Sequence, residues 1–101
     1  MTDVSVQAPP FLGAETRAAF YEEALDRLAS LGSEPEVAGR LVIDLSRTTG
    51  IDSMGLSTLV LLQLRAAERR QTICLRGASE QVRFLLLMTR LEDRFDIETP
   101  P

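Results

Sequence analysis

The feature that most constrains this chain is an apolar strand pattern that leads through a short polar loop into an apolar helix. Residues 41–45 are Leu-Val-Ile-Asp-Leu, a β-favouring run typical of a strand that is buried on both faces. Asp52 and Ser53 then supply two residue types that are preferred at a helix N-cap. The pattern predicts a central strand over about 40–46 and a helix over about 54–70, with Ser53 where the helix begins.

The rest of the chain alternates short strand patterns with helical ones. The apolar periodicity predicts a strand at 4–7 that Pro9-Pro10 ends, a helix at 14–31, a strand at 71–76 closed by Gly77, a helix from Ser79 to 90 and a strand at 95–97. We therefore expect an α/β fold whose later strands are largely parallel, with helices packed against the sheet. One domain should span residues 1–101, with its core at about 4–98.

The spacing of apolar residues also predicts which helix faces are buried. In the first helix the expected buried stripe is Ala18, Tyr21, Leu25, Leu28 and Leu31, with Gly32 as C-cap before a polar turn at 33–36. In the last helix it is Val82, Leu85, Leu86 and Thr89, widened by Phe84, Leu87, Met88 and Leu91. The middle helix is apolar most of the way round, so it is either buried on two sides or leaves surface for a partner.

Composition excludes several kinds of function. The net charge is −4 and the 11 basic residues, all arginine, form no basic stripe, which argues against nucleic acid as a partner. The chain has no histidine, which excludes histidine-based acid–base chemistry and histidine metal sites. The single cysteine, Cys74, lies in an apolar run where we expect a buried thiol. The apolar runs are short and no signal peptide is visible, so we expect a cytoplasmic protein without direct membrane insertion.

Three kinds of chemistry can use a serine placed like Ser53. A nucleophile needs a base, but histidine and lysine are both absent and the adjacent Asp52 is poorly placed to act as one. A phosphate-binding loop needs more glycines and a lysine before the helix, so Gly50 and Gly55 match that pattern only weakly. The third role is that of a phosphoacceptor, because a serine in the first helical turn is accessible to a kinase. On the residues alone, a simple N-cap role for Ser53 is equally well supported.

A phosphate on Ser53 is expected to change binding more than folding. The helix dipole favours it by roughly 0.3–1 kcal/mol, whereas the carboxylates of Asp52 and Asp44 oppose it, so the two effects partly cancel. Phosphoserine adds a charge of about −1.5 to −2 near neutral pH. A bound partner, rather than the fold, should therefore respond to the modification.

Residues 43–46 (Ile-Asp-Leu-Ser) and 51–56 (Ile-Asp-Ser-Met-Gly-Leu) place an Asp-Ser-x-Gly-Leu core at the strand–helix junction. This core resembles the signature of STAS domains, in particular bacterial anti-sigma factor antagonists. Further residues fall where that family has its last helix and strand: Ser79, Val82, Leu85, Thr89, Leu91, Phe95 and Ile97. The resemblance covers about 38–98 and implies a four- or five-stranded, mostly parallel (mixed) sheet with helices mainly on one face.

The resemblance also implies a regulatory protein-binding module that is not an enzyme and holds no cofactor. It implies phosphorylation at Ser53 and a partner-binding surface that consists of Thr49, Asp52, Ser53, Met54, Gly55 and Leu56. The unphosphorylated antagonist would bind an anti-sigma factor that is also a serine kinase. That kinase would use ATP to switch binding off, and a phosphatase would restore it. A second role stays open, as a STAS subunit with a constitutive interface in a lipid-transport ATPase complex or a stress-signalling scaffold.

Two features depart from the family pattern. Family members usually begin with a hairpin, whereas here only residues 4–7 form a strand pattern and Pro-Pro-Phe-Leu-Gly at 9–13 follows it. An edge strand left unpaired in this way can bind another chain, including a second copy in a homodimer. Met54 replaces a residue that is commonly small, which predicts narrower access to Ser53, while Gly55 is expected to let a partner backbone approach closely.

Overall fold

The computed structural model describes residues 2–31 and 39–98 and confirms an α/β fold. Its main sheet has four parallel strands in the order β1 (Thr2–Gln7), β3 (Gly39–Asp44), β5 (Thr72–Arg76) and β6 (Asp96–Glu98). The helices are α1 (Arg17–Ser30), α2 (Ser53–Glu68), α3 (Glu80–Met88) and the short 3-10 helix η1 (Glu92–Arg94). A second parallel pair consists of β2 (Phe11–Leu12) and β4 (Gly50–Ile51). Gly32 and the turn expected at 33–36 lie outside the described residues.

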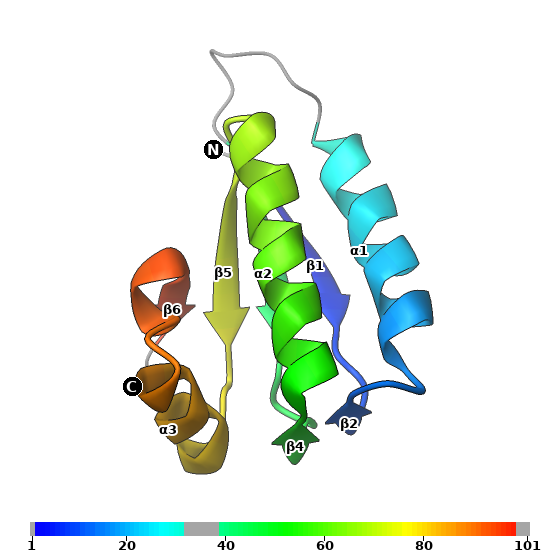
Figure 1. Ribbon diagram of the computed structural model, residues 1–101. Coiled ribbons are helices and arrows are strands. Elements are labelled where there is room, and N and C mark those ends of the chain that lie inside the picture. The colour runs from blue at the N-terminus through cyan, green and yellow to red at the C-terminus, as the bar shows by residue number, and fades with distance from the viewer. Residues whose placement is uncertain (1, 32–38, 99–101) are drawn as a thin grey trace.

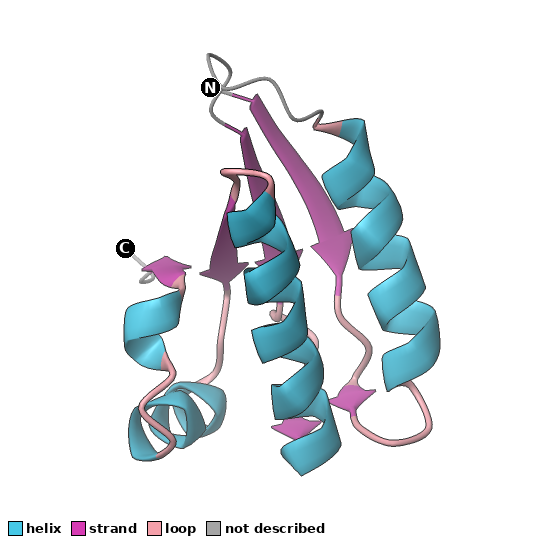
Figure 2. Cartoon of the chain, turned by 45° about the horizontal axis from the view of Figure 1, so that its top comes forward, coloured by secondary structure: helices cyan, strands magenta, loops and turns pink. Residues whose placement is uncertain are grey.

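The helices cover one face of the sheet, as expected. Figure 1 shows α1 and α2 side by side across that face, and α3 beyond the end at which β5 terminates. Because all four strands are parallel, their carboxyl ends lie at one edge of the sheet, and α2 begins at that same edge (Figures 1 and 2). Among the described elements, no helix covers the opposite face, which we call the bare face.

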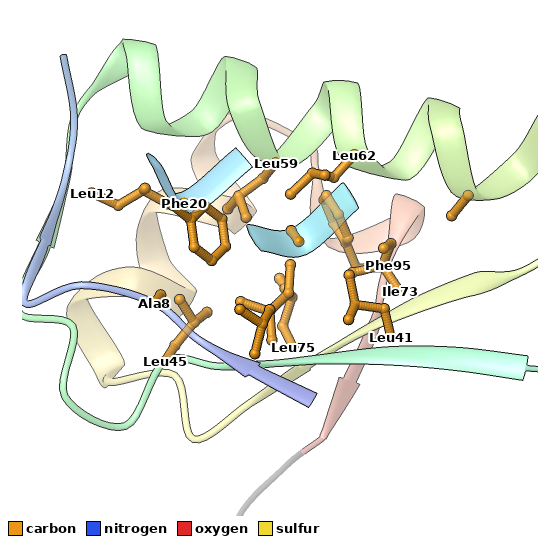
Figure 3. Close-up of a cluster of buried hydrophobic side chains, with 14 of the residues drawn as sticks. Ala8, Leu12, Phe20, Leu41, Leu45, Leu59, Leu62, Ile73, Leu75 and Phe95 are labelled. Atoms are coloured by element: carbon orange, nitrogen blue, oxygen red, sulfur yellow. The ribbon is translucent and has the colours of Figure 1, made fainter. Parts of the chain in front are cut away.

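The core lies between the sheet and the two long helices (Figure 3). Alternate side chains of β3 and β5, among them Leu41 and Leu75, point toward the helices and are fully buried. In α1 the buried residues are Phe20, Ala24 and Leu28. The expectation that Ala18 belongs to this stripe is wrong, because Ala18 is exposed. The centre of the buried stripe passes through Phe20, whose large ring contributes more to burial than a methyl group can.

The bare face is polar at its surface, and the apolar side chains of its central strands are buried beneath. Val42 and Cys74 point away from the helical layer, yet each is only 1% exposed. Arginines from the same strands form cross-strand ion pairs with exposed carboxylates, Arg40 with Asp3 at 2.9 Å and Arg76 with Glu98 at 3.0 Å. Long arginine stems cover apolar surface while their charged ends remain in water. This face therefore needs no helix to shield its central strands.

The expectation for α3 is half right. Val82 and Leu86 are buried, as the stripe predicts, and Ser79 caps the helix by accepting a hydrogen bond from the Val82 N–H at 3.2 Å. Three of the four residues expected to widen the stripe instead face solvent, Phe84 at 61% exposure, Leu87 at 56% and Met88 at 65%, whereas Leu91 packs against the core. Thr89, which was expected within the stripe, is exposed. The helix has nine residues and lies at the margin of the sheet, so only one side of it meets the core.

Candidate functional site

The start of α2 rests on a second pair of short strands. Phe11 pairs with Gly50 and Leu12 with Ile51, which places the segment after Pro10 against the loop before α2. Hydrogen bonds extend this pairing: the Thr49 N–H donates to the Pro10 carbonyl at 2.7 Å and the buried Thr48 hydroxyl to the Pro9 carbonyl at 2.9 Å. The sequence pattern missed both strands, because two residues are too few to show periodicity.

Asp52 is the N-cap of α2. Its Oδ1 accepts a hydrogen bond from the Gly55 N–H at 2.9 Å, which satisfies one of the free donors of the first turn. Its Oδ2 lies 3.4 Å from the Ala14 N–H, in the loop before α1. The Asp52 N–H itself donates to the Leu12 carbonyl at 3.2 Å. Asp52 therefore ties three segments together, and the alternative in which Ser53 is the cap is wrong.

Ser53 is the first residue of α2 and its side chain is exposed. Within the described part of the chain, no hydrogen bond occupies its hydroxyl. The next serine on the same helix differs, since the Ser57 hydroxyl donates to the Ser53 carbonyl at 2.9 Å. Met54 is also exposed, at 40%, so the narrower access that its size predicts is not seen. Ser53 thus presents an uncommitted hydroxyl at the positive end of a helix dipole.

The glycine at 55 has an internal explanation. Gly55 is buried, and a Cβ built there would collide with the carbonyl oxygen of Leu12 and come within 2.8 Å of the Ile51 Cγ2. In the described structure, the backbone that approaches Gly55 is that of Leu12 in this same chain. This close approach positions β2 beside the first turn of α2.

An exposed aromatic residue that the sequence did not single out lies beside this junction. Phe11 is 52% exposed and lines a hollow of about 300 Å³ together with Ala14, Glu15, Thr16 and Asp52. Its ring lies over Gly13 and Gly50, where a Cβ would approach ring carbons within 2.6 to 2.9 Å. The signal available in the sequence was an aromatic residue directly after two prolines.

The nearby Asp44 carboxylate is held by its own turn. Ser46 lowers the pKa of Asp44 through side-chain and backbone hydrogen bonds, the latter from the Ser46 N–H at 2.9 Å. The Asp44 carboxylate is therefore bonded within its own turn. The carboxylate next to Ser53 in the chain is that of Asp52, and one of its oxygens accepts a hydrogen bond from the helix.

The residues predicted for partner binding differ in accessibility. Thr49, Ser53 and Met54 are exposed, Asp52 and Leu56 are half-buried, and Gly55 is buried. Leu56 packs against the core and also lines a hollow between α2 and α3. Thr49, Asp52, Gly55 and Leu56 each have a contact within the fold. Ser53 is therefore the polar side chain most available to a partner.

Solved structures with the same fold come from different kinds of protein. A Thermotoga maritima protein described as a putative anti-sigma factor antagonist matches with a TM-score of 0.76 and 21% identity, over 95% of this chain and 80% of its own. A sulfate transporter family protein from Wolinella succinogenes matches with a TM-score of 0.72 and 13% identity, over 94% and 75%. The murine anion transporter Solute Carrier 26 family member A9 matches with a TM-score of 0.74 and 19% identity, over 94% of this chain and 16% of its own.

The fold and the Asp-Ser-x-Gly-Leu junction define a STAS domain. The chain belongs to the family described as Mlab, STAS domain, whose model matches residues 11–98. Among curated proteins, none matches the sequence significantly. Across residues 2–31 and 39–98, the helices are too short or too polar to cross a membrane. The same residues contain no cluster of three or more acidic or cysteine side chains suited to a metal ion.

Proposed function

We propose that this STAS domain is an anti-sigma factor antagonist whose binding is switched by phosphorylation of Ser53. Unphosphorylated, it binds an anti-sigma factor that is also a serine kinase, through the surface around Ser53. The kinase uses ATP to phosphorylate Ser53 and so releases itself, and a phosphatase reverses the modification. The chain acts as a regulatory binding module in the cytoplasm and performs no catalysis itself.

The observation that carries this proposal is the division of roles between Asp52 and Ser53. Asp52 caps α2, so the Ser53 hydroxyl is exposed and free of hydrogen bonds among the described residues. Phosphorylation would break no bond of the fold and would meet the free N–H groups of the first turn.

The charge added to Ser53 is large enough to act as a switch. A phosphoserine carries about −1.5 to −2 charges, and leaving it unpaired within a protein interface costs on the order of 3–5 kcal/mol. Because about 1.4 kcal/mol is a tenfold change in affinity, the loss would be at least about a hundredfold.

The proposal is tested by measuring the affinity of candidate anti-sigma factor kinases for wild type, Ser53→Ala, Ser53→Glu and the enzymatically phosphorylated protein. Wild type and Ser53→Ala should bind equally, whereas the phosphoprotein should bind at least about a hundredfold more weakly. Phosphosite mapping should find phosphate on Ser53 and none on Ser57, which is exposed on the same face of α2.

The matched control is Ser5→Glu, which adds the same charge to the exposed Ser5 on strand β1. It should bind like wild type, and circular dichroism should show every variant folded. Equal binding by the phosphoprotein and the unmodified protein would refute the switch.

A second function is supported by the transport proteins among the structural matches. Two of the three similar structures are a sulfate transporter family protein and an anion transporter, and the latter chain is several times longer than this one. The chain would then be a STAS subunit with a constitutive interface, for example in a lipid-transport ATPase complex. In that case a partner would be retained by all Ser53 variants with unchanged affinity.

A further inference from the structure

The surface of α2 and α3 carries nearly all of the exposed large apolar side chains in the described structure. Six of the seven lie on these two helices: Met54, Leu61, Leu64, Phe84, Leu87 and Met88. A hollow of about 520 Å³ lies between the helices, lined by Leu56, Ser57, Val60, Leu61, Leu64, Thr89 and Leu91. We call this surface the α2–α3 face. Contiguous apolar patches of this kind are rare on monomers and mark binding surfaces.

We infer that the α2–α3 face binds a second copy of this chain in a two-fold symmetric dimer. The hollow is lined mainly by α2, and the exposed side chains of Phe84, Leu87 and Met88 lie on α3. A two-fold axis brings the same surface of both copies together, so the apolar side chains of each copy can pack against those of the other.

Charge also favours a second copy on this face. The chain carries a net charge of −4, which opposes self-association over most of its surface. However, the twelve residues from Ser53 to Leu64 include no charged side chain. Two copies can therefore place their α2 helices together without burying like charges. The charged pair Arg65 and Glu68 lies beyond this stretch, where it can remain in solvent.

The amount of exposed apolar surface matches what a stable dimer needs. The six side chains are between 39% and 65% exposed. With the roughly 150 Å² of an aromatic side chain as an upper value for each residue, the face presents at most on the order of 450 Å² of apolar surface. Two copies would bury at most about 900 Å², which is comparable to the apolar part of a standard interface of roughly 1,600 Å².

The dimer has a consequence for the switch, and this step rests on the proposed function. Ser53 lies at the start of the outward side of α2, and Ser57 and Leu64 follow on the same side at helical spacing. A kinase bound at Ser53 would cover part of the α2–α3 face, so dimerisation and kinase binding would compete. The dimer itself requires no phosphorylation, so its tests use the unmodified protein.

Sedimentation velocity of the full chain over a range of concentrations tests the inference. Wild type should convert from monomer to dimer with a single dissociation constant. Leu64→Glu and Leu87→Glu should each raise that constant at least about a hundredfold, because each dimer would bury two unpaired carboxylates. Both positions are exposed, at 48% and 56%, so these variants should fold. Ala19→Glu, which adds a carboxylate to an exposed position on α1, should dimerise like wild type.

Cross-linking identifies which surface is used. Leu61→Cys, near the middle of α2, should form a covalent dimer on oxidation, and Ser5→Cys, on the edge strand β1, should not. A wild-type chain that stays monomeric at every concentration overturns the inference. So does a dimer that persists in Leu64→Glu and Leu87→Glu, or one that cross-links through Ser5→Cys, since the edge of β1 would then be the interface.

Discussion

Asp52 and Ser53 are neighbours in the chain, yet only the Asp52 side chain is bonded to the helix that follows. The Asp52 carboxylate accepts the Gly55 N–H at 2.9 Å, whereas the Ser53 hydroxyl is exposed to solvent. A helix start can thus be stable and still offer a free hydroxyl, which is the arrangement that a reversible modification needs.

Removal of the cap should weaken the fold measurably. Asp52→Ala is expected to lower the free energy of unfolding by about 1 kcal/mol, within roughly 0.5–2 kcal/mol, because the Gly55 N–H loses its acceptor. Asp52→Asn should retain most of the stability, since asparagine caps helices about as well. Urea denaturation followed by circular dichroism measures both. An equal loss in the two variants would show that charge, and not capping, is the contribution of Asp52.

The contact between Gly55 and Leu12 predicts that alanine at position 55 will destabilise the protein, although alanine normally stabilises a helix. Alanine normally stabilises a helix relative to glycine by about 1 kcal/mol. Here Gly55→Ala should instead destabilise by roughly 1–3 kcal/mol, because its methyl group meets the Leu12 carbonyl oxygen. Ser57→Ala, at an exposed position in the next turn, is the control and should be neutral or slightly stabilising. Stabilisation by Gly55→Ala would mean that β2 is not held against α2.

The stability of the protein should fall in acid partly through Asp44. Its pKa is lowered from the usual value of 3.8, chiefly by hydrogen bonds from Ser46. A lowered pKa in the folded state means that the contribution is complete above 3.8 and is lost as the pH falls through the lowered value. Asp44→Asn keeps a hydrogen-bond acceptor but removes the titration, so its unfolding free energy should decline less steeply below that pH. Identical slopes for both proteins would contradict the assignment.

The thiol of Cys74 should be protected in the native state. Burial raises its pKa, and the side chain is only 1% exposed beneath the bare face of the sheet. Since the thiolate is the reactive form, a thiol reagent should modify native Cys74 on the order of a hundredfold more slowly than the unfolded chain. Ser5→Cys provides an exposed thiol on the same face for comparison. Equal rates for the two thiols would show that the bare face opens readily.

Several local features could be predicted because short-range physics decides them. The buried run at 41–45 became β3, Ser79 caps α3 through the Val82 N–H, and α2 begins within one residue of the expected position. Each of these depends on side-chain shape, capping hydrogen bonds or apolar spacing, which are determined by residues close together in the sequence. The resemblance to STAS domains predicted the family, and the family match over residues 11–98 confirmed it.

Other predictions, of which helix residues are buried, were wrong because burial depends on how far a helix overlaps the sheet. The pattern of α3 predicted a wide buried stripe, but Phe84, Leu87 and Met88 are exposed since α3 lies at the margin. In α1 the pattern favoured Ala18, whereas burial is centred on Phe20 and Ala24. Periodicity identifies an apolar side of a helix, but it does not show how much of that side will find a neighbour.

The sequence by itself determined the order of the four strands of the main sheet and of the three α-helices, the junction at residues 52–56 and the absence of histidine chemistry, because these follow from residue types and their spacing along the chain. Only the tertiary structure decided that Asp52 rather than Ser53 is the cap, that Gly55 makes room for Leu12, and that an apolar surface stays open on α2 and α3. Each of these depends on contacts between segments far apart in the chain. Such contacts exist only after the sheet has brought those segments together.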